Sequence, residues 1–318
     1  MIIKYRKEPV KILGYEALLK RLPPNHLKRA AVKNSLNSAR AGYGGEERLD
    51  RAMEYFDPPY SHQIIQDFSL PAPYKIQVDT VVLTQSGVFL LEVKNITGKL
   101  QFKQNPSVLH SILSDGKIKS YKSPITQMNE TSMRLRMFLK QLGCPLPVTS
   151  MIVISYPSQI VEDAPATAHV LSVGEVNYYL SEMTQANPVL SIEELDSLGQ
   201  QFLSAHQDYE PFPLAPKFQI DLSDIEPGVF CPRCLLGKMT KTTLAWECET
   251  CRLISRNAHV HALDEWFMLM KPTISTAECC EFIGLKSLDA AKHFLLKNGC
   301  QPIGSRRYRQ YVRKPVIK

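Results

Sequence analysis

The stretch of sequence that decides the fold runs from Gln77 to Lys94 and reads QVDTVVLTQSGVFLLEVK. Two apolar runs rich in β-branched residues flank a short polar segment that contains Ser86-Gly87. This pattern predicts a β-hairpin. The neighbours of its charged residues are strongly apolar, which indicates a buried sheet. These neighbours are Val78, Val82, Leu91 and Val93.

The register of this hairpin determines where its charged side chains lie. A symmetric loop centred on the polar segment places Asp79 opposite Glu92 and Gln77 opposite Lys94. Because side chains of a strand alternate between two faces, all four would then project from one face. A three-residue loop would shift the register by one and send the pairs to opposite faces. The alternative interpretation is a strand pair with polar residues on its solvent face.

The expected carboxylate pair indicates a metal site. Directly opposed residues have Cβ atoms about 4.5–5.5 Å apart, and two carboxylates at that distance repel each other unless one holds a proton. A divalent cation removes this conflict, and hard oxygen ligands suit Mg²⁺ or Mn²⁺. Lys94 would lie beside the ion, where an amine can hold an attacking water or stabilise charge on a phosphate.

Several short motifs surround and include this hairpin. They are Gly42-x-x-Gly45-Glu46, Gln77-x-Asp79, Gly87-Val88-Phe89-x-x-Glu92-x-Lys94-Asn95 followed by Gly98, and a Pro-x-x-Gln element within Ser123–Asn129. In this order they resemble the nuclease-related domain, NERD, which is grouped with the PD-(D/E)XK nuclease superfamily. The resemblance covers roughly residues 10 to 160, about half of the chain.

The resemblance implies an α/β fold in which a mixed sheet is flanked by helices, with a restriction-endonuclease-like core. It implies metal ligation by Asp79 and Glu92, a catalytic lysine, and one contribution each from a first and a later helix. The site residues implied in this way are Asp79, Glu92, Lys94, Glu46 and Gln127. Glu47 is the rival to Glu46, and the alternative for Gln127 is a surface helix position.

Four of the eight cysteines form two C-x-x-C pairs with 13 residues between them. Each pair can bend into a turn that aims two thiolates at one ion, and two such turns make a closed tetrahedral zinc site of the structural kind. A redox dithiol and an iron–sulfur cluster are the alternatives, although a thioredoxin-type site needs only one such pair on a βαβ unit. The expected zinc ligands are Cys231, Cys234, Cys248 and Cys251.

Basic residues gather at the C-terminal end of the chain. The net charge is +7, and residues 286–318 contain nine Lys or Arg and a single acid. This segment therefore favours binding of a polyanion, most simply nucleic acid. A solvated basic tail and a protein-docking module are the alternatives. The expected contacts to nucleic acid are Lys286, Lys292, Lys297, Arg306, Arg307, Arg309 and Arg313.

The same segment resembles a helix-turn-helix. A short helix over residues 274–283 is expected to end at Gly284, and Ser287 can cap a second helix. Apolar spacing predicts that the second helix turns four side chains inward. These are Leu288, Ala291, Leu295 and Leu296. The run of basic and aromatic residues from 306 to 313 resembles the wing strand of a winged helix.

The pattern along the chain predicts three folded parts and a linker rich in proline. The expected boundaries are 1–207 for the nuclease-like domain, 208–229 for the linker, 230–266 for the zinc ribbon and 267–318 for the basic helical domain. The apolar runs are far shorter than the roughly 20 residues that span a bilayer, and the N-terminus carries no signal-like stretch. We therefore expect a cytoplasmic location.

These observations favour a bacterial-type nuclease that hydrolyses phosphodiester bonds of DNA with a divalent metal, while the zinc ribbon and basic domain hold the substrate. Repair or defence are the roles that this class of enzyme suggests. One alternative is a non-catalytic DNA-binding protein that uses a nuclease fold. The other is a cytosolic regulatory or scaffold protein that docks a protein partner.

Overall fold

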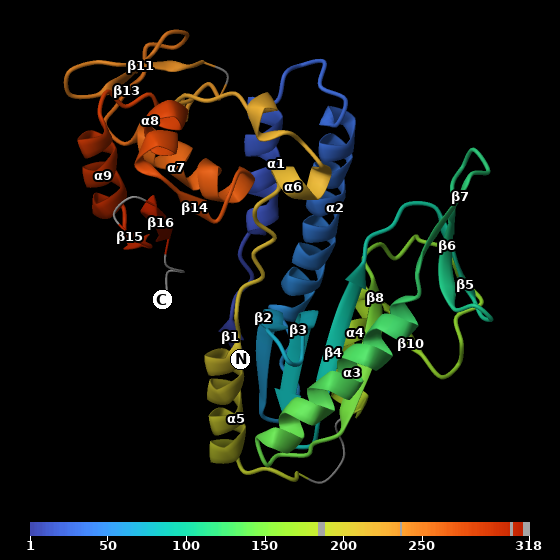
Figure 1. Cartoon of the computed structure of the whole chain (residues 1–318). Coiled ribbons are helices and arrows are strands. Elements are labelled where there is room, and N and C mark those ends of the chain that lie inside the picture. Colours follow the sequence, from blue (N-terminus) through green and yellow to red (C-terminus); the bar gives the residue numbers. More distant parts are fainter. Residues whose placement is uncertain (184–187, 236, 306–307, 314–318) are drawn as a thin grey trace. The chain divides into compact units, whose positions relative to one another are not determined.

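The computed structural model describes residues 1–183, 188–235, 237–305 and 308–313 (Figure 1). The chain divides into two compact units. The first consists of Met1–Glu8 and Arg40–Tyr209, and the second of Pro9–Ala39 and Glu210–Lys318. No helix in the described part of the chain is long and apolar enough to cross a membrane.

The first unit is built on a mixed β-sheet. In the described residues its strand order is β1-β2-β3-β4-β8-β10, with antiparallel pairs on either side of β3 and parallel pairs elsewhere. The strands are β1 (Ile2–Lys4), β2 (His62–Leu70), β3 (Ile76–Thr84), β4 (Val88–Lys94), β8 (Val148–Ile154) and β10 (His169–Ser172). The fold class expected from the sequence, a mixed sheet flanked by helices, is confirmed.

Helices cover this sheet, as Figure 1 shows. They are α2 (Arg29–Met53), α3 (Pro124–Gln141), α4 (Val176–Met183), which follows η1 (Val173–Glu175), and α5 (Ile192–Ala205). One apolar cluster joins α3 and α5 to the sheet through Val81 and Leu83, and another joins α2 and α4 to it through Val82. Since neighbouring positions of a strand face opposite sides, the two helix pairs lie on the two faces of the sheet.

The helix α2 contains the glycines of the Gly42-x-x-Gly45-Glu46 motif in its interior. It begins at Arg29 and runs through these glycines. A glycine inside a helix is unfavourable by about 1 kcal/mol relative to alanine. The close packing of Gly45, described below, explains why one of them is needed.

A second sheet extends the first unit, with the strand order β7-β6-β5-β9. Its strands are β5 (Lys99–Lys103), β6 (Val108–Ile112), β7 (Ile118–Lys122) and β9 (Val161–Glu162). The turn between β6 and β7 lies at Asp115-Gly116, where Gly116 has a φ of 79° and the Asp115 carboxylate accepts the N–H of Lys117. The strand β7 leads into α3, which Ser123 caps by accepting the N–H of Thr126.

The second unit has one hydrophobic core that α1, the cysteine-rich segment and the C-terminal helices share. Its helices are α1 (Val10–Arg21), α6 (Ala215–Phe218), η2 (Leu222–Asp224), α7 (Ala258–Leu269), α8 (Thr276–Ile283) and α9 (Leu288–Lys297). Its strands are β11 (Met239–Lys241), β12 (Trp246–Cys248), β13 (Ile254–Ser255), β14 (Thr273–Ile274), β15 (Cys300–Ile303) and β16 (Gln310–Arg313).

The compact units divide the chain differently from the expected boundaries. The segment expected to be a linker, residues 208–229, buries four apolar side chains in the core of the second unit: Leu214, Ile220, Ile225 and Val229. Helix α1, expected in the nuclease-like domain, also belongs to this unit. Its Arg21 is fully buried and donates to Glu265 of α7 at 2.7 Å and to the carbonyl of Glu226. Such a buried charge needs these partners.

Candidate active site

The β3–β4 hairpin has the register that the sequence predicts. Thr80 pairs with Leu91, and the antiparallel pairs continue from there to the turn. Thr84 closes the turn, because its hydroxyl accepts the N–H groups of Ser86 and Gly87. The symmetric register is therefore confirmed for the turn and the pairs next to it. The ladder ends at Thr80, so it does not include the expected pairs Asp79–Glu92 and Gln77–Lys94.

Asp79 binds the opposite strand through its side chain. Its Oδ2 atom accepts the backbone N–H of Val93 at 2.7 Å. Farther along β4, Glu92 lies opposite Ile152 and Lys94 opposite Ile154 of the parallel strand β8. The carboxylates thus lie just beyond the last β3–β4 pair, where β4 is still paired with β8.

Glu92, Lys94 and Gln127 form a hydrogen-bonded cluster at this end of β4. The Lys94 ammonium donates to Glu92 Oε1 at 2.6 Å and to Gln127 Oε1 at 3.2 Å. The amide of Gln127 donates to the same oxygen of Glu92 at 2.7 Å. The side chain of Glu92 is only 9% exposed. Helix α3 therefore brings Gln127 to the hairpin as the resemblance implied.

The charges of the site act on Asp79. Burial raises the pKa of the Asp79 carboxyl well above its ordinary value, and the nearby carboxylates of Glu92 and Glu46 raise it further. The hydrogen bond from Val93 and the charge of Arg6 oppose this shift. The carboxylate of Asp79 is therefore repelled by two others, and a cation among the three would relieve this repulsion.

Glu46 of α2 is linked to the backbone of Asp79 by Arg6, a residue that the sequence interpretation missed. Arg6 donates to Glu46 Oε2 and to Asp50 Oδ2, both at 2.8 Å, and to the backbone carbonyl of Asp79 at 2.7 Å. Glu46 is half-buried, whereas its rival Glu47 is exposed. Two acids four residues apart on one helix face are a sequence signal for such a cation, but nothing local identifies Arg6.

Gly45 allows α2 to approach the ends of β4 and β8. A Cβ atom at this position would lie 2.7 Å from Asn95 Cβ and 2.7 Å from Ser155 Oγ. Both neighbours are fixed, because Asn95 donates to the carbonyl of Ala41 at 2.7 Å and Ser155 donates to the carbonyl of Lys94. The glycine therefore sets the distance between Glu46 and the hairpin.

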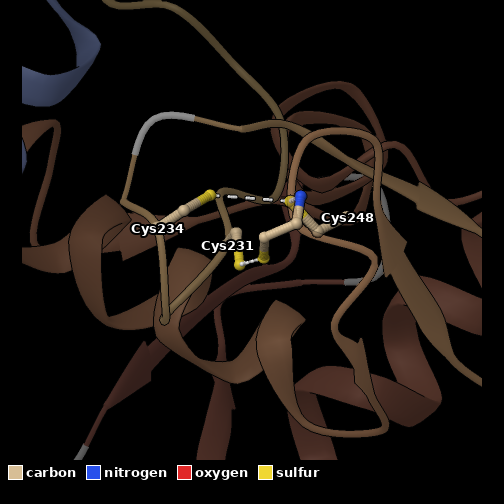
Figure 2. Close-up of side chains that lie close together, drawn as sticks. Cys231, Cys234 and Cys248 are labelled. Atoms are coloured by element: carbon tan, nitrogen blue, oxygen red, sulfur yellow. Dashed lines mark hydrogen bonds between the residues drawn. The ribbon is translucent and has the colours of Figure 1, made fainter.

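The cysteine pairs of the second unit converge as predicted. In the described part of the chain they are the one group of three or more possible ligand side chains whose ligand atoms lie within 4.8 Å of one another. Figure 2 shows the side chains of Cys231, Cys234 and Cys248 turned toward one another. The sulfur of Cys231 lies 3.5 Å from that of Cys251, and the sulfurs of Cys234 and Cys248 are 3.6 Å apart.

These distances suit a tetrahedral four-thiolate site. Zinc–sulfur bonds of about 2.3 Å place the sulfurs of such a site about 3.8 Å apart. Backbone N–H groups also point at the sulfurs: Cys251 donates to Cys248 and Arg233 donates to Cys231, each at 3.4 Å. The bond from Cys251 is the main cause that lowers the pKa of the Cys248 thiol to about 6. The cluster could hold a metal, and its three-stranded sheet β11-β12-β13 is consistent with a small zinc-binding motif.

The residues that match a known family include the carboxylate site. Residues 41–155 match the family model for NERD, the nuclease-related domain. This NERD segment contains the hairpin, Glu46 and Gln127, and it indicates a nuclease-related function for this part of the chain. No curated protein and no solved structure matches the chain.

Outside the NERD segment, the C-terminal part combines helices with a small sheet. The helices α7, α8 and α9 and the sheet β14-β16-β15 follow one another with the strand β14 between α7 and α8. Gly284 ends α8 with a φ of 81°, and Ser287 caps α9 by accepting the N–H of Ala290. The predicted turn and cap are therefore present.

The expected basic contacts of this part differ in their surroundings. Four of them are exposed: Lys286, Lys292, Lys297 and Arg313. Arg309 is half-buried, and Arg313 forms an ion pair with Asp264 of α7. Arg306 and Arg307 lie outside the described residues.

One packing prediction for α9 is wrong. Leu288 and Leu296 are 56% and 45% exposed, although we expected them to face inward. The buried face consists of Ala291, Phe294 and Leu295, because the core lies on a narrower side of this short helix. The exposed side of α9 therefore carries apolar residues beside its lysines.

Proposed function

We propose that the chain is a divalent-metal-dependent nuclease that hydrolyses phosphodiester bonds of DNA at the end of the β3–β4 hairpin. The observation that carries this proposal is the cluster of Asp79, Glu92, Lys94 and Gln127 within the NERD segment. The spacing of an acid on β3, an acid on β4 and a lysine two residues later is what the resemblance to PD-(D/E)XK nucleases implies.

The donor set fits Mg²⁺ or Mn²⁺. Asp79 and Glu92 offer hard carboxylate oxygens, and a cation would offset both the burial and the repulsion that raise the pKa of Asp79. Glu46, whose charge also raises the pKa of Asp79, is a third carboxylate near the site. When bound, the ion would supply Lewis-acid stabilisation of the phosphate and a water of lowered pKa.

The side chains of the site would position the phosphate and the attacking water. Lys94, held by Glu92 and Gln127, aims a positive charge at the end of β4 and can donate to a phosphate oxygen or to the attacking water. Gln127 fixes the rotamers of both partners through its amide. Arg6 positions Glu46 and stabilises the backbone at Asp79.

The second unit would bind metal and substrate without taking part in the chemistry. We propose that its four cysteines hold a structural zinc ion, since four thiolates leave no coordination position for water. The exposed lysines of α9 and the turn before it would contact phosphates of the same nucleic acid. Arg313, which is paired with Asp264, would then hold the strand β16 to α7.

The test is cleavage of supercoiled plasmid by the full chain with Mg²⁺ or Mn²⁺, beside EDTA. We expect nicked or linear product that disappears with EDTA and in an Asp79→Ala/Lys94→Ala double variant. A double variant of exposed residues in the same unit, Asp115→Ala/Lys122→Ala, should retain cleavage. If plasmid, single strands and RNA all stay intact in every metal while DNA still shifts in a gel, the chain binds DNA without cleaving it.

A further inference from the structure

A cavity of about 320 Å³ lies directly beyond the catalytic lysine. Two segments line it, residues 95–99, which follow Lys94 of β4, and residues 156–160, which follow the end of β8. Since β4 and β8 are parallel neighbours, the cavity lies at their carboxyl ends, where open α/β sheets commonly bind ligands. Its volume is at the lower end of the range for small-molecule sites, about 300–1,000 Å³, which suits a single nucleoside.

The walls of this cavity are held in place. Gln159 donates to the carbonyl of Gly98 at 3.0 Å and also to that of Ile96, so its amide joins the two segments. The N–H of Leu100 donates to the carbonyl of Ile160 at 2.9 Å. Gly98 is needed here, because it has a φ of 95° and a Cβ atom would lie 2.6 Å from the carbonyl oxygen of Ile112.

The cavity offers an aromatic platform and polar groups together. Tyr156 lines it with 40% of its surface exposed. The guanidinium of Arg48 lies 4.0 Å from the centre of the Tyr156 ring and donates to its hydroxyl at 3.1 Å. Asn95, Ser158 and Lys99 add polar side chains to the lining. Aromatic side chains bind unpaired bases by stacking, and an arginine beside them can contact the backbone phosphates.

We propose that this cavity binds one unpaired nucleotide next to the scissile phosphate, with its base stacked on Tyr156. The inference rests on the proposed nuclease function and specifies its substrate as single-stranded nucleic acid or an unpaired strand end. A base within a duplex is stacked and paired, so it could not enter a cavity that begins one residue after Lys94 without leaving the helix.

The first test needs no cleavage. A single-stranded oligonucleotide carrying 5-iodouracil is bound to the full chain in EDTA and photo-crosslinked, and the modified peptide is mapped by mass spectrometry. We expect a crosslink at Tyr156 that is lost in Tyr156→Ala and in the presence of an excess of unlabelled single strand. Crosslinks confined to the second unit would overturn the proposal, whatever the catalytic activity.

The second test compares a labelled single strand with the blunt duplex of the same sequence in Mn²⁺. We expect the wild type to prefer the single strand and Tyr156→Ala to raise KM for it about tenfold. Tyr156→Phe should stay within about twofold, because the ring remains, and Tyr178→Ala, another exposed tyrosine of this unit, should match the wild type. Equal KM values for Tyr156→Ala and Tyr178→Ala would refute the pocket, whereas a wild type that cuts neither substrate would refute the nuclease function instead.

Discussion

The two sites of this protein contrast in how the chain assembles them. The cysteine cluster comes from two turns within 21 residues, and its sulfurs converge on one another. The carboxylate site draws on the N-terminal segment, α2, the hairpin and α3, and its acids are held by the cations Arg6 and Lys94. The contrast teaches that the ligands of the first site lie close together in sequence, while the second site is assembled by contacts between distant segments.

The largest effect should follow loss of the cysteine site. The variant Cys234→Ser should lose about one zinc ion per chain, and the second unit should unfold, because zinc binding contributes on the order of 10 kcal/mol to such motifs. Zinc content by atomic absorption and hydrogen exchange of each unit measure both outcomes. Cys144→Ser, a half-buried cysteine of the first unit, is the control and should keep the zinc. A Cys234→Ser chain with full zinc and protected α7 amides would contradict the assignment.

The next effect separates chemistry from metal binding in the carboxylate site. Lys94→Ala should lower the cleavage rate by about 10²–10³, the effect of removing one donor to a developing charge. Its thermal stabilisation by Mn²⁺ should remain, whereas Asp79→Ala should lose that stabilisation. Lys119→Ala, an exposed lysine of β7, serves as the control. A Lys94→Ala enzyme of normal rate would remove the lysine from the mechanism.

A smaller effect should distinguish two glycines of the same helix. Gly45→Ala should destabilise the first unit by about 1–3 kcal/mol, because the new methyl group would overlap Asn95 and Ser155. Gly44→Ala has nothing within 4 Å of its Cβ position and should stabilise α2 by about 0.5–1 kcal/mol. Urea unfolding monitors both. Equal shifts for the two variants would mean that α2 does not pack against Asn95 and Ser155 as described.

The smallest effect concerns the proton on Asp79. Its pKa is raised in the folded protein, so the stability that its proton contributes is present below the ordinary pKa of an aspartate and is lost as pH rises through the raised value. In EDTA, Asp79→Asn should therefore melt about 2–4 °C above the wild type at high pH and close to it at low pH. Its oxygen can still accept the Val93 N–H. A difference that does not grow with pH would show that the pKa of Asp79 is not raised in the folded protein.

Local sequence patterns predicted those parts of the molecule that depend on residues close together in the chain. The alternation of residues around Ser86-Gly87 predicted the hairpin and its register, and the two C-x-x-C turns predicted the cluster. The cap at Ser287 was also correct. The packing of α9 was predicted less well, because helical spacing alone does not say how wide the buried face of a short helix is.

The sequence by itself determined which side chains are available for chemistry and in what order: two acids and a lysine on one hairpin, and four cysteines in two turns. Only the tertiary structure decided which distant groups complete them. The approach of Arg6 to Glu46 and the burial of Leu214 in the second unit depend on contacts between segments far apart in sequence. Such contacts form because burial favours the whole arrangement, and no spacing along the chain records them.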